Sequence, residues 1–218
     1  MSRDRGRVHQ ARVLWVEWLS RKVFSIRMER PPGFEFSPGQ SIRLDHDGVE
    51  RDYSLASGPA DPHLTLCVRL VTGGMLSPRL GALSPGNLLR FTGPHGYFLF
   101  QGDDRQPVFV ATGTGVAPFL SMVRSGVRGF TLLHGVRDVV DLYYRDVVRP
   151  LAQRYVPCLS AGTGEGCYHG RVTSWAAENL APGPYDFYLC GNRSMIRDFT
   201  LLVDDRFVGS RVCTEVFH

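Results

Sequence analysis

This 218-residue sequence lacks the features that assign a function most directly. It has no run of about eighteen or more apolar residues, which excludes a transmembrane helix and leaves no reason to expect a membrane partner. Its basic start leads into alternating, strand-like sequence and not into an apolar signal segment, so we expect a cytoplasmic protein. The H-E-x-x-H pattern of zinc peptidases and the G-x-S-x-G elbow of α/β-hydrolases are both missing, so a hydrolase has no support.

Cysteines are few and scattered. None belongs to a C-x-x-C pair, and an odd number at irregular spacing argues against a disulfide framework. The same spacing argues against an iron–sulfur or zinc site, so we expect no metal site and no metal cluster in the chain. The cysteines are Cys67, Cys158, Cys167, Cys190 and Cys213.

Lysine is almost absent. Of the 25 lysines and arginines, Lys22 is the only lysine. The planar guanidinium group pairs well with phosphate and carboxylate groups. No basic cluster with interleaved aromatic residues marks a nucleic-acid surface, so we expect no nucleic-acid partner. The net charge of +4 fits an acidic protein partner or a phosphorylated small molecule better.

The pattern of apolar residues changes along the chain. Residues 1–101 contain short apolar runs separated by PPG, SPG and SGPADP, which is typical of an antiparallel barrel or sandwich. In residues 106–218 strand-like runs alternate with helix-like runs, which predicts right-handed β-α-β units around a parallel sheet. We therefore predict two domains with these bounds, joined by a linker near residues 101–107. Within the second domain we expect a helix over residues 138–155 and a mobile loop over the glycine-rich residues 160–170.

The most informative stretch is ATGTGVAPFL, residues 111–120. A buried strand is expected to end at Thr112, Gly113 and Gly115 allow a tight turn, and a helix follows with Pro118 in its first turn. Such helix N-termini bind phosphate through free N–H groups and the helix dipole. The third glycine of G-x-G-x-x-G and the G-K-[ST] ending of a P-loop are missing, so a plain strand–helix turn explains the stretch equally well.

Three weaker patterns also indicate ligand binding. In YLCGNRSMIRDF, residues 188–199, Cys190 is expected at the carboxyl end of a strand, where open α/β sheets bind ligands, although a buried cysteine is often only a small hydrophobic residue. In GGMLSPRL, residues 73–80, a short helical turn offers free N–H groups to a phosphate, or is simply a loop with a serine N-cap. In RDYS, Arg51 and Tyr53 would lie on one strand face, roughly 7 Å apart, and suit a pyrophosphate and a flat ring system.

Taken in order, the motifs R-x-Y-S, G-x-L-S-P-R-L, G-T-G-x-x-P, C-G-N-x-x-M and a C-terminal T-E-x-aromatic resemble the ferredoxin–NADP reductase superfamily. The chain is most similar to the compact bacterial ferredoxin/flavodoxin–NADP reductases, from about Arg12 to His218. His218 stands where close bacterial relatives often have an aromatic residue. The resemblance implies an N-terminal six-stranded antiparallel barrel of Greek-key type that holds FAD, and a C-terminal α/β domain with a five-stranded parallel sheet that holds NADP(H).

In the first domain the resemblance implies that Arg51 binds the FAD pyrophosphate, that Tyr53 packs along the isoalloxazine and ribityl chain, and that Ser54 lies near flavin N5. In a regular strand Ser54 points away from Tyr53, so its role requires a bend or a backbone contact. Residues 74–77 match the family's phosphate-binding turn. The implied FAD residues are Arg51, Asp52, Tyr53, Ser54, Cys67, Gly74, Met75, Leu76, Ser77, Thr114 and Phe217.

In the second domain the resemblance implies that Thr114 and the glycines beside it hold the coenzyme pyrophosphate and that Cys190 lies against the nicotinamide. Glu215 and Phe217 match the tail that closes over the flavin, and Ser54, Cys190 and Glu215 form the implied catalytic set. The implied NADP residues are Thr112, Gly113, Gly115, Pro118, Arg137, Arg171, Cys190, Gly191, Asn192 and Met195.

Coenzyme preference stays open. NADP-specific members of the family place three arginines around the 2′-phosphate, from H-x-x-R, S-R and G-R segments. Here Arg137 and Arg171 match two of them, but Ala161 stands where the middle arginine is expected. Two of three cations favour NADPH, whereas Asp138, beside Arg137, suits a ribose hydroxyl and therefore NADH.

The resemblance implies a flavoprotein oxidoreductase that exchanges electrons between NADP(H) and a one-electron carrier, ferredoxin or flavodoxin, by hydride transfer at flavin N5. An acidic carrier suits the basic surface, and we expect a monomer. One alternative is an NADH-dependent reductase component of a multicomponent oxygenase, whose acceptor would be a separate protein because the chain has no cysteine cluster. The others are a free-flavin or metal reductase, and a non-catalytic electron-transfer or regulatory subunit of a larger complex. The residues alone do not separate FAD from FMN.

Overall fold

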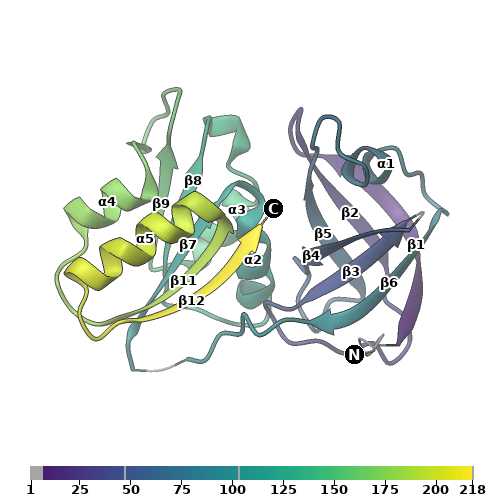
Figure 1. Cartoon of the computed structure of the whole chain (residues 1–218), viewed down its shortest axis with the longest axis horizontal. Coiled ribbons are helices and arrows are strands. Elements are labelled where there is room, and N and C mark those ends of the chain that lie inside the picture. The colour runs from purple at the N-terminus through teal and green to yellow at the C-terminus, as the bar shows by residue number, and fades with distance from the viewer. Residues whose placement is uncertain (1–6, 47, 103, 218) are drawn as a thin grey trace. The chain divides into compact units, whose positions relative to one another are not determined.

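The chain forms two compact units, Met1–Leu99 and Phe100–His218, in a computed structural model that describes residues 7–46, 48–102 and 104–217 (Figure 1). Each unit contains one six-stranded sheet and its own hydrophobic core. In the part of the chain that the structure describes, no helix is both long enough and apolar enough to cross a membrane.

Unit 1 is an antiparallel sheet with the strand order β4-β3-β6-β1-β2-β5. The bridge between Leu55 and Leu66 joins the continuation of β4 to β5, so the two edge strands meet and the sheet closes as a barrel. A short helix, α1, lies between β5 and β6 in the sequence. The elements are β1 Val8–Trp18, β2 Val23–Glu29, β3 Ser41–His46, β4 Val49–Ser54, β5 His63–Arg69, α1 Ser77–Gly81 and β6 Leu88–His95.

The barrel interior follows from strand periodicity. Alternate residues of a strand point to the same face, and Phe24, Ile26 and Met28 of β2 all belong to one buried cluster. Leu64 and Leu66 of β5 add to it from the neighbouring strand. The apolar runs of the first half of the sequence thus form one continuous core.

Unit 2 is a parallel sheet with the strand order β10-β9-β8-β7-β11-β12, and α-helices cover both of its faces. Helices α4 and α5 pack in one core cluster with Val108 and Val110 of β7. Phe109, which alternates with these valines, stacks on Phe119 of α2 on the other face, at 4.6 Å between ring centroids. The elements are β7 Gln106–Thr112, η1 Gly113–Val116, α2 Ala117–Arg124, β8 Thr131–Val136, η2 Val139–Asp141, α3 Arg145–Val148, η3 Arg149–Leu151, β9 Arg154–Leu159, β10 Tyr168–His169, α4 Val172–Asn179, β11 Tyr185–Asn192, α5 Arg193–Arg206 and β12 Arg211–Phe217.

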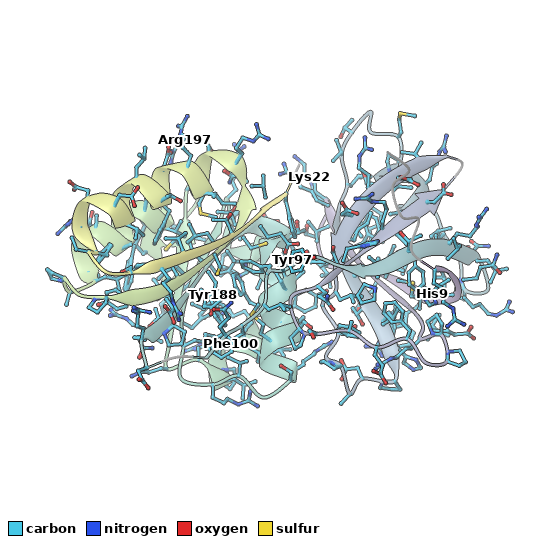
Figure 2. All side chains as sticks on the ribbon, turned by 60° about the horizontal axis from the view of Figure 1, so that its bottom comes forward. His9, Lys22, Tyr97, Phe100, Tyr188 and Arg197 are labelled. Carbon is cyan, nitrogen blue, oxygen red and sulfur yellow. The ribbon has the colours of Figure 1, made fainter. Side chains whose placement is uncertain are left out.

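Aromatic side chains fill the α2 face of this sheet. Tyr188 of β11 lies 5.6 Å from Phe100, measured between ring centroids, and both residues are labelled in Figure 2. The hydroxyl of Tyr188 accepts a hydrogen bond from the Gln101 N–H at 3.1 Å. Phe100 and Gln101, at the start of unit 2, therefore pack against the core of the same unit.

The predicted antiparallel barrel followed by a parallel α/β sheet is confirmed, with two differences in detail. The sheet has a sixth strand, β10, which consists of two residues at the end of the glycine-rich stretch expected to be a loop, and α4 begins directly after that stretch. The helix predicted over residues 138–155 is wrong. Tyr144 adopts the left-handed conformation (φ 58°), Pro150 lacks an N–H, and β9 has begun by Arg154, so only short helical turns form.

Candidate functional site

In unit 2 a glycine turn follows β7 directly. Gly113 has a φ of 54°, in the left-handed region that glycine adopts without steric cost. A Cβ at Gly115 would overlap the carbonyl oxygen of Cys190, so η1 rests directly on the carboxyl end of β11. Pro118 lies in the first turn of α2, where its missing N–H leaves no partner unsatisfied. The backbone of the turn therefore comes closer to the sheet than any side chain would allow.

A side-chain link fastens the carboxyl ends of β7 and β11 to each other. The Thr112 Oγ1 accepts hydrogen bonds from the Asn192 N–H at 3.0 Å and from the Asn192 Nδ2 at 3.2 Å. Gly191, with a φ of 139°, passes so close that a Cβ there would overlap the same Oγ1. Asn192 Oδ1 accepts the Met195 N–H at 2.8 Å and thus caps α5, while the Met195 side chain packs in the core.

Cys190 is fully buried in β11, next to Glu215 of β12. Its Sγ lies 3.9 Å from Glu215 Oε2. Burial raises the pKa of the Cys190 thiol well above its usual value, and the nearby Glu215 carboxylate raises it further. The thiol is therefore protonated at neutral pH, and it is not a thiolate nucleophile.

The two predicted coenzyme arginines line one cavity of about 420 Å³. Arg137 follows β8 directly, and Arg171 stands immediately before α4. Ser160, Ala161 and Gly170 complete the lining. The cavity thus lies beyond the carboxyl ends of two neighbouring parallel strands, where open α/β sheets bind their ligands. Two guanidinium groups at one cavity provide charge and hydrogen-bond donors for an anion.

Asp138, the residue that suits a ribose hydroxyl, is already engaged with its own chain. Its Oδ1 accepts the Val139 N–H at 2.7 Å and caps η2. A Cβ at Gly162 would lie 3.2 Å from Oδ2, so this carboxylate packs closely against the glycine-rich segment. Asp138 does not line the cavity that Arg137 and Arg171 share.

In unit 1 the R-D-Y-S residues lie on β4 as expected, but each of them has different surroundings. Arg51 is exposed, and its Nη1 donates to the Glu50 carbonyl at 2.7 Å. Asp52 forms a bidentate ion pair with Arg43 of β3, at 2.7 and 2.9 Å. Tyr53 is half-buried against the barrel core, and burial raises its pKa to about 12, so the phenol is neutral.

Ser54 keeps the opposite strand face from Tyr53. Leu55 and Leu66 form a bridge and both belong to the core, so Ser54, one position earlier, is turned away from that core. In the same antiparallel register Ser54 stands opposite Cys67, and both residues are 5% exposed. The structure therefore brings these two predicted FAD residues together, with no bend that would bring the Ser54 side chain to the Tyr53 face.

The predicted phosphate turn before α1 is held by its own hydrogen bonds. Ser77 Oγ accepts the Val71 N–H at 2.9 Å, and the Gly74 N–H donates to the Val71 carbonyl at 2.9 Å. Leu76 is a core residue, whereas the Met75 side chain is 62% exposed. The Leu76 side chain thus packs the turn against the core, and the Ser77 hydroxyl stabilises it by a hydrogen bond to its first residue.

Two other predicted residues, Thr114 and Phe217, lie at the edge of the unit 2 sheet where β7 and β11 end. Thr114 is in η1, and its carbonyl accepts the Ala117 N–H. Phe217, half-buried in β12, pairs in register with Asn192 of β11. His218 lies outside the described residues. The sequence motifs assign no role of its own to His134, which is fully buried in β8. Its place within the apolar run FTLLHGVR was the available signal.

Comparison with known proteins identifies both units. Residues 16–100 match the oxidoreductase FAD-binding domain, and residues 109–200 match the oxidoreductase NAD-binding domain. Over 171 residues the chain is 39% identical to ferredoxin–NADP reductase B of Sorangium cellulosum, covering 70% of each protein.

A second relative is named for a different role. Over 217 residues the chain is 30% identical to the ferredoxin–NAD(P)(+) reductase component of naphthalene 1,2-dioxygenase/salicylate 5-hydroxylase systems of a Ralstonia species, covering 90% of this chain and 66% of that one. Among solved structures, the ferredoxin NADP+ reductase of Neisseria gonorrhoeae with bound FAD and NADP has a TM-score of 0.88 at 23% identity, covering 97% of this chain and 99% of that one. This last likeness confirms the fold.

Proposed function

Because the chain belongs to the ferredoxin–NADP reductase-like family of flavoprotein oxidoreductases, with an FAD-binding and an NAD(P)-binding domain, we propose that it exchanges electrons between NADPH and a small one-electron carrier protein, a ferredoxin or a flavodoxin. The observation that carries this proposal is the cavity that Arg137 and Arg171 share at the carboxyl edge of the unit 2 sheet. It fits the one group, a 2′-phosphate, that distinguishes NADPH from NADH.

The residues of unit 2 fit a dinucleotide. The glycine turn would offer backbone N–H groups to a pyrophosphate, because Gly113 allows the left-handed turn and Gly115 lets η1 pack closely on β11. Arg137 and Arg171 would hold the 2′-phosphate. Cys190, protonated and fully buried, would support the nicotinamide site from behind its surface and help to exclude water.

The residues of unit 1 fit a flavin nucleotide. The exposed Arg51 guanidinium would bind the pyrophosphate, and the neutral Tyr53 ring would pack on the flat ring system or its ribityl chain. The 71–77 turn would add backbone N–H groups beside the phosphates. When bound, FAD supplies the redox chemistry that connects a two-electron coenzyme with a one-electron carrier. The protein would contribute binding, orientation and the exclusion of water.

Ser54 and Cys67 would form the wall behind the flavin, not its stacking face, because they lie on the strand face opposite Tyr53. In this position the Ser54 hydroxyl or backbone would act as a hydrogen-bonding neighbour of the ring. Replacing Ser54 with alanine should slow flavin reduction more than it weakens FAD retention, as followed by stopped-flow absorbance and by FAD content.

A carrier-coupled assay tests the proposed activity. The purified protein, loaded with FAD, is expected to reduce cytochrome c with NADPH only when a ferredoxin or flavodoxin is added. Cytochrome c reduction at the same rate without either carrier would contradict the proposed acceptor. A purified protein that takes up no flavin would contradict the whole proposal.

A second candidate, the reductase component of an oxygenase, is favoured by the 30% identity to the Ralstonia reductase component over 90% of this chain. The chain spans 66% of that relative. An NADH preference, together with faster electron transfer to an oxygenase ferredoxin than to a flavodoxin, would favour this candidate over the first.

A further inference from the structure

A buried histidine lies behind the glycine turn of unit 2. His134 of β8 is 0% exposed and stands in register with Ala111 of β7. Gly113 follows Ala111 by two residues and opens η1 directly after β7. The Gly113 backbone is the polar group of this turn that acts on the imidazole.

The two ring nitrogens of His134 have different surroundings. Nδ1 lies 3.0 Å from the hydroxyl of Tyr155 on β9. Nε2 has no hydrogen-bond partner within the described residues, although it is fully enclosed. Burial lowers the pKa of His134 to about 4, against the opposing effect of the Gly113 backbone, so the imidazole is neutral at physiological pH. A backbone group that favours the charged imidazolium acts as an acceptor, which is the role of a carbonyl oxygen.

A neutral imidazole carries one proton. When the Tyr155 O–H donates to Nδ1, the proton resides on Nε2, and Nε2–H is the donor available to the Gly113 carbonyl. A buried donor without a partner is rare in folded proteins and calls for a reason. A small movement of the turn that brings the carbonyl onto Nε2–H would satisfy it.

The Gly113 carbonyl and the Thr114 N–H belong to one planar trans peptide and point in opposite directions. A carbonyl held inward by His134 therefore directs the Thr114 N–H outward, toward the space where a phosphate would bind. Because Gly113 has no Cβ and adopts a left-handed φ of 54°, this peptide plane is easily rotated without such a tether.

We propose that His134, held by Tyr155, is a positioning residue that sets the peptide plane of Gly113 and Thr114 for the coenzyme pyrophosphate. This inference rests on the proposed function, since it requires that a dinucleotide binds at the turn. It is independent of the Arg137–Arg171 cavity, which would bind a different part of the same ligand.

The test uses the intact FAD-loaded protein and its Tyr155→Phe variant, which removes the hydroxyl but keeps the ring. Tyr185→Phe is the matched control, because its hydroxyl donates to the Ala181 carbonyl at the opposite, amino-terminal edge of the sheet. We expect Tyr155→Phe to raise the KM for NADPH and for NADH alike, by about tenfold, since both carry the pyrophosphate. FAD content, and kcat at saturating coenzyme, should stay within about twofold of wild type.

A ligand without the pyrophosphate separates positioning from general damage to unit 2. Adenosine 2′-monophosphate keeps the group that Arg137 and Arg171 would bind, so its inhibition constant should be unchanged in Tyr155→Phe. His134→Leu should resemble Tyr155→Phe, whereas His134→Gln, which keeps a side-chain N–H, should recover part of the affinity. If His134→Leu does not fold, Tyr155→Phe and His134→Gln still decide the question.

Equal weakening of NADPH and of adenosine 2′-monophosphate would overturn the inference, because it would mark His134 and Tyr155 as structural residues only. An unchanged KM in Tyr155→Phe and His134→Gln would overturn it as well. Both results leave the proposed function standing. A wild-type protein that oxidises neither NADPH nor NADH would overturn the proposed function, and this inference with it.

Discussion

The two units differ in how the residues of their candidate ligand sites are held. In unit 2 the site is shaped by missing side chains and by buried polar links, as at Gly115, Gly191 and the Thr112–Asn192 pair. In unit 1 Arg51 and Asp52 of the R-D-Y-S motif are exposed and contact polar groups of neighbouring residues at the surface, whereas Tyr53 is half-buried and Ser54 is buried. Unit 2 is therefore preorganised by packing, whereas the unit 1 site depends more on the ligand to order its side chains.

The largest effect is expected where packing in unit 2 leaves no space. Gly191→Ala combines a strained φ of 139° with overlap on Thr112 Oγ1 and should lower the free energy of unfolding by about 4 kcal/mol. Urea unfolding measures this value. Gly126→Ala is the control, because its φ of 105° is also strained but nothing lies within 4 Å, so only about 1 kcal/mol should be lost. Equal losses in both variants would show that close packing at Gly191 is unimportant.

The buried imidazole of unit 2 gives the next effect. Its pKa is lowered from 6.5 to about 4, so between these values the unfolded chain binds a proton that the folded chain does not. The free energy of unfolding should therefore fall as the pH falls from about 6.5 toward 4, by on the order of 3 kcal/mol from this group. Carboxylates titrate in the same range, so the measured quantity is the difference between wild type and His134→Gln. Parallel pH profiles in the two proteins would contradict the assignment.

The third effect concerns the cavity lined by Arg137 and Arg171, the proposed site of the 2′-phosphate. Arg137→Ala and Arg171→Ala should each reduce kcat/KM for NADPH by about tenfold and leave NADH little changed, since each removes one charge-assisted pair to the 2′-phosphate. Arg197→Ala, on the exposed side of α5, is the matched control and should change neither value (Figure 2). A similar loss with both coenzymes would mean that the arginines do not read the 2′-phosphate.

The smallest effect is expected in unit 1. Asp52→Asn breaks the ion pair with Arg43, but the pair is exposed, so the free energy of unfolding should fall by only about 0.5 kcal/mol. FAD affinity should stay close to wild type, because Asp52 is already engaged with Arg43. A large loss of FAD from Asp52→Asn would show that this carboxylate contacts the cofactor, and would make the unit 1 site more preorganised than the comparison holds.

The sequence predicted what local chemistry determines. Alternating apolar residues located the barrel strands, and the glycines after Thr112 located the turn, because these signals depend only on near neighbours. The strand argument also placed Ser54 and Tyr53 on opposite faces, as observed. Arg137 and Arg171 were predicted to share a site through their motifs, and the parallel register of β8 and β9 places both at one edge.

The features that the sequence did not predict depend mainly on contacts between residues that are distant in the sequence. The pair of His134 and Tyr155 requires the register of two parallel strands, which no local pattern reveals. The two residues of β10 form a strand only because β9 lies beside them. The left-handed Tyr144 interrupts a helical pattern that composition alone would continue.

The central claim is that NADPH delivers its electrons to FAD bound by this chain. Anaerobic mixing of NADPH with the purified, FAD-loaded protein tests it most directly, with the oxidised flavin absorbance as the signal. We expect rapid loss of this absorbance in the wild-type protein. At limiting NADPH, the loss in Arg171→Ala should be about tenfold slower or less complete. Flavin absorbance that persists in wild type with NADPH and with NADH would contradict the account.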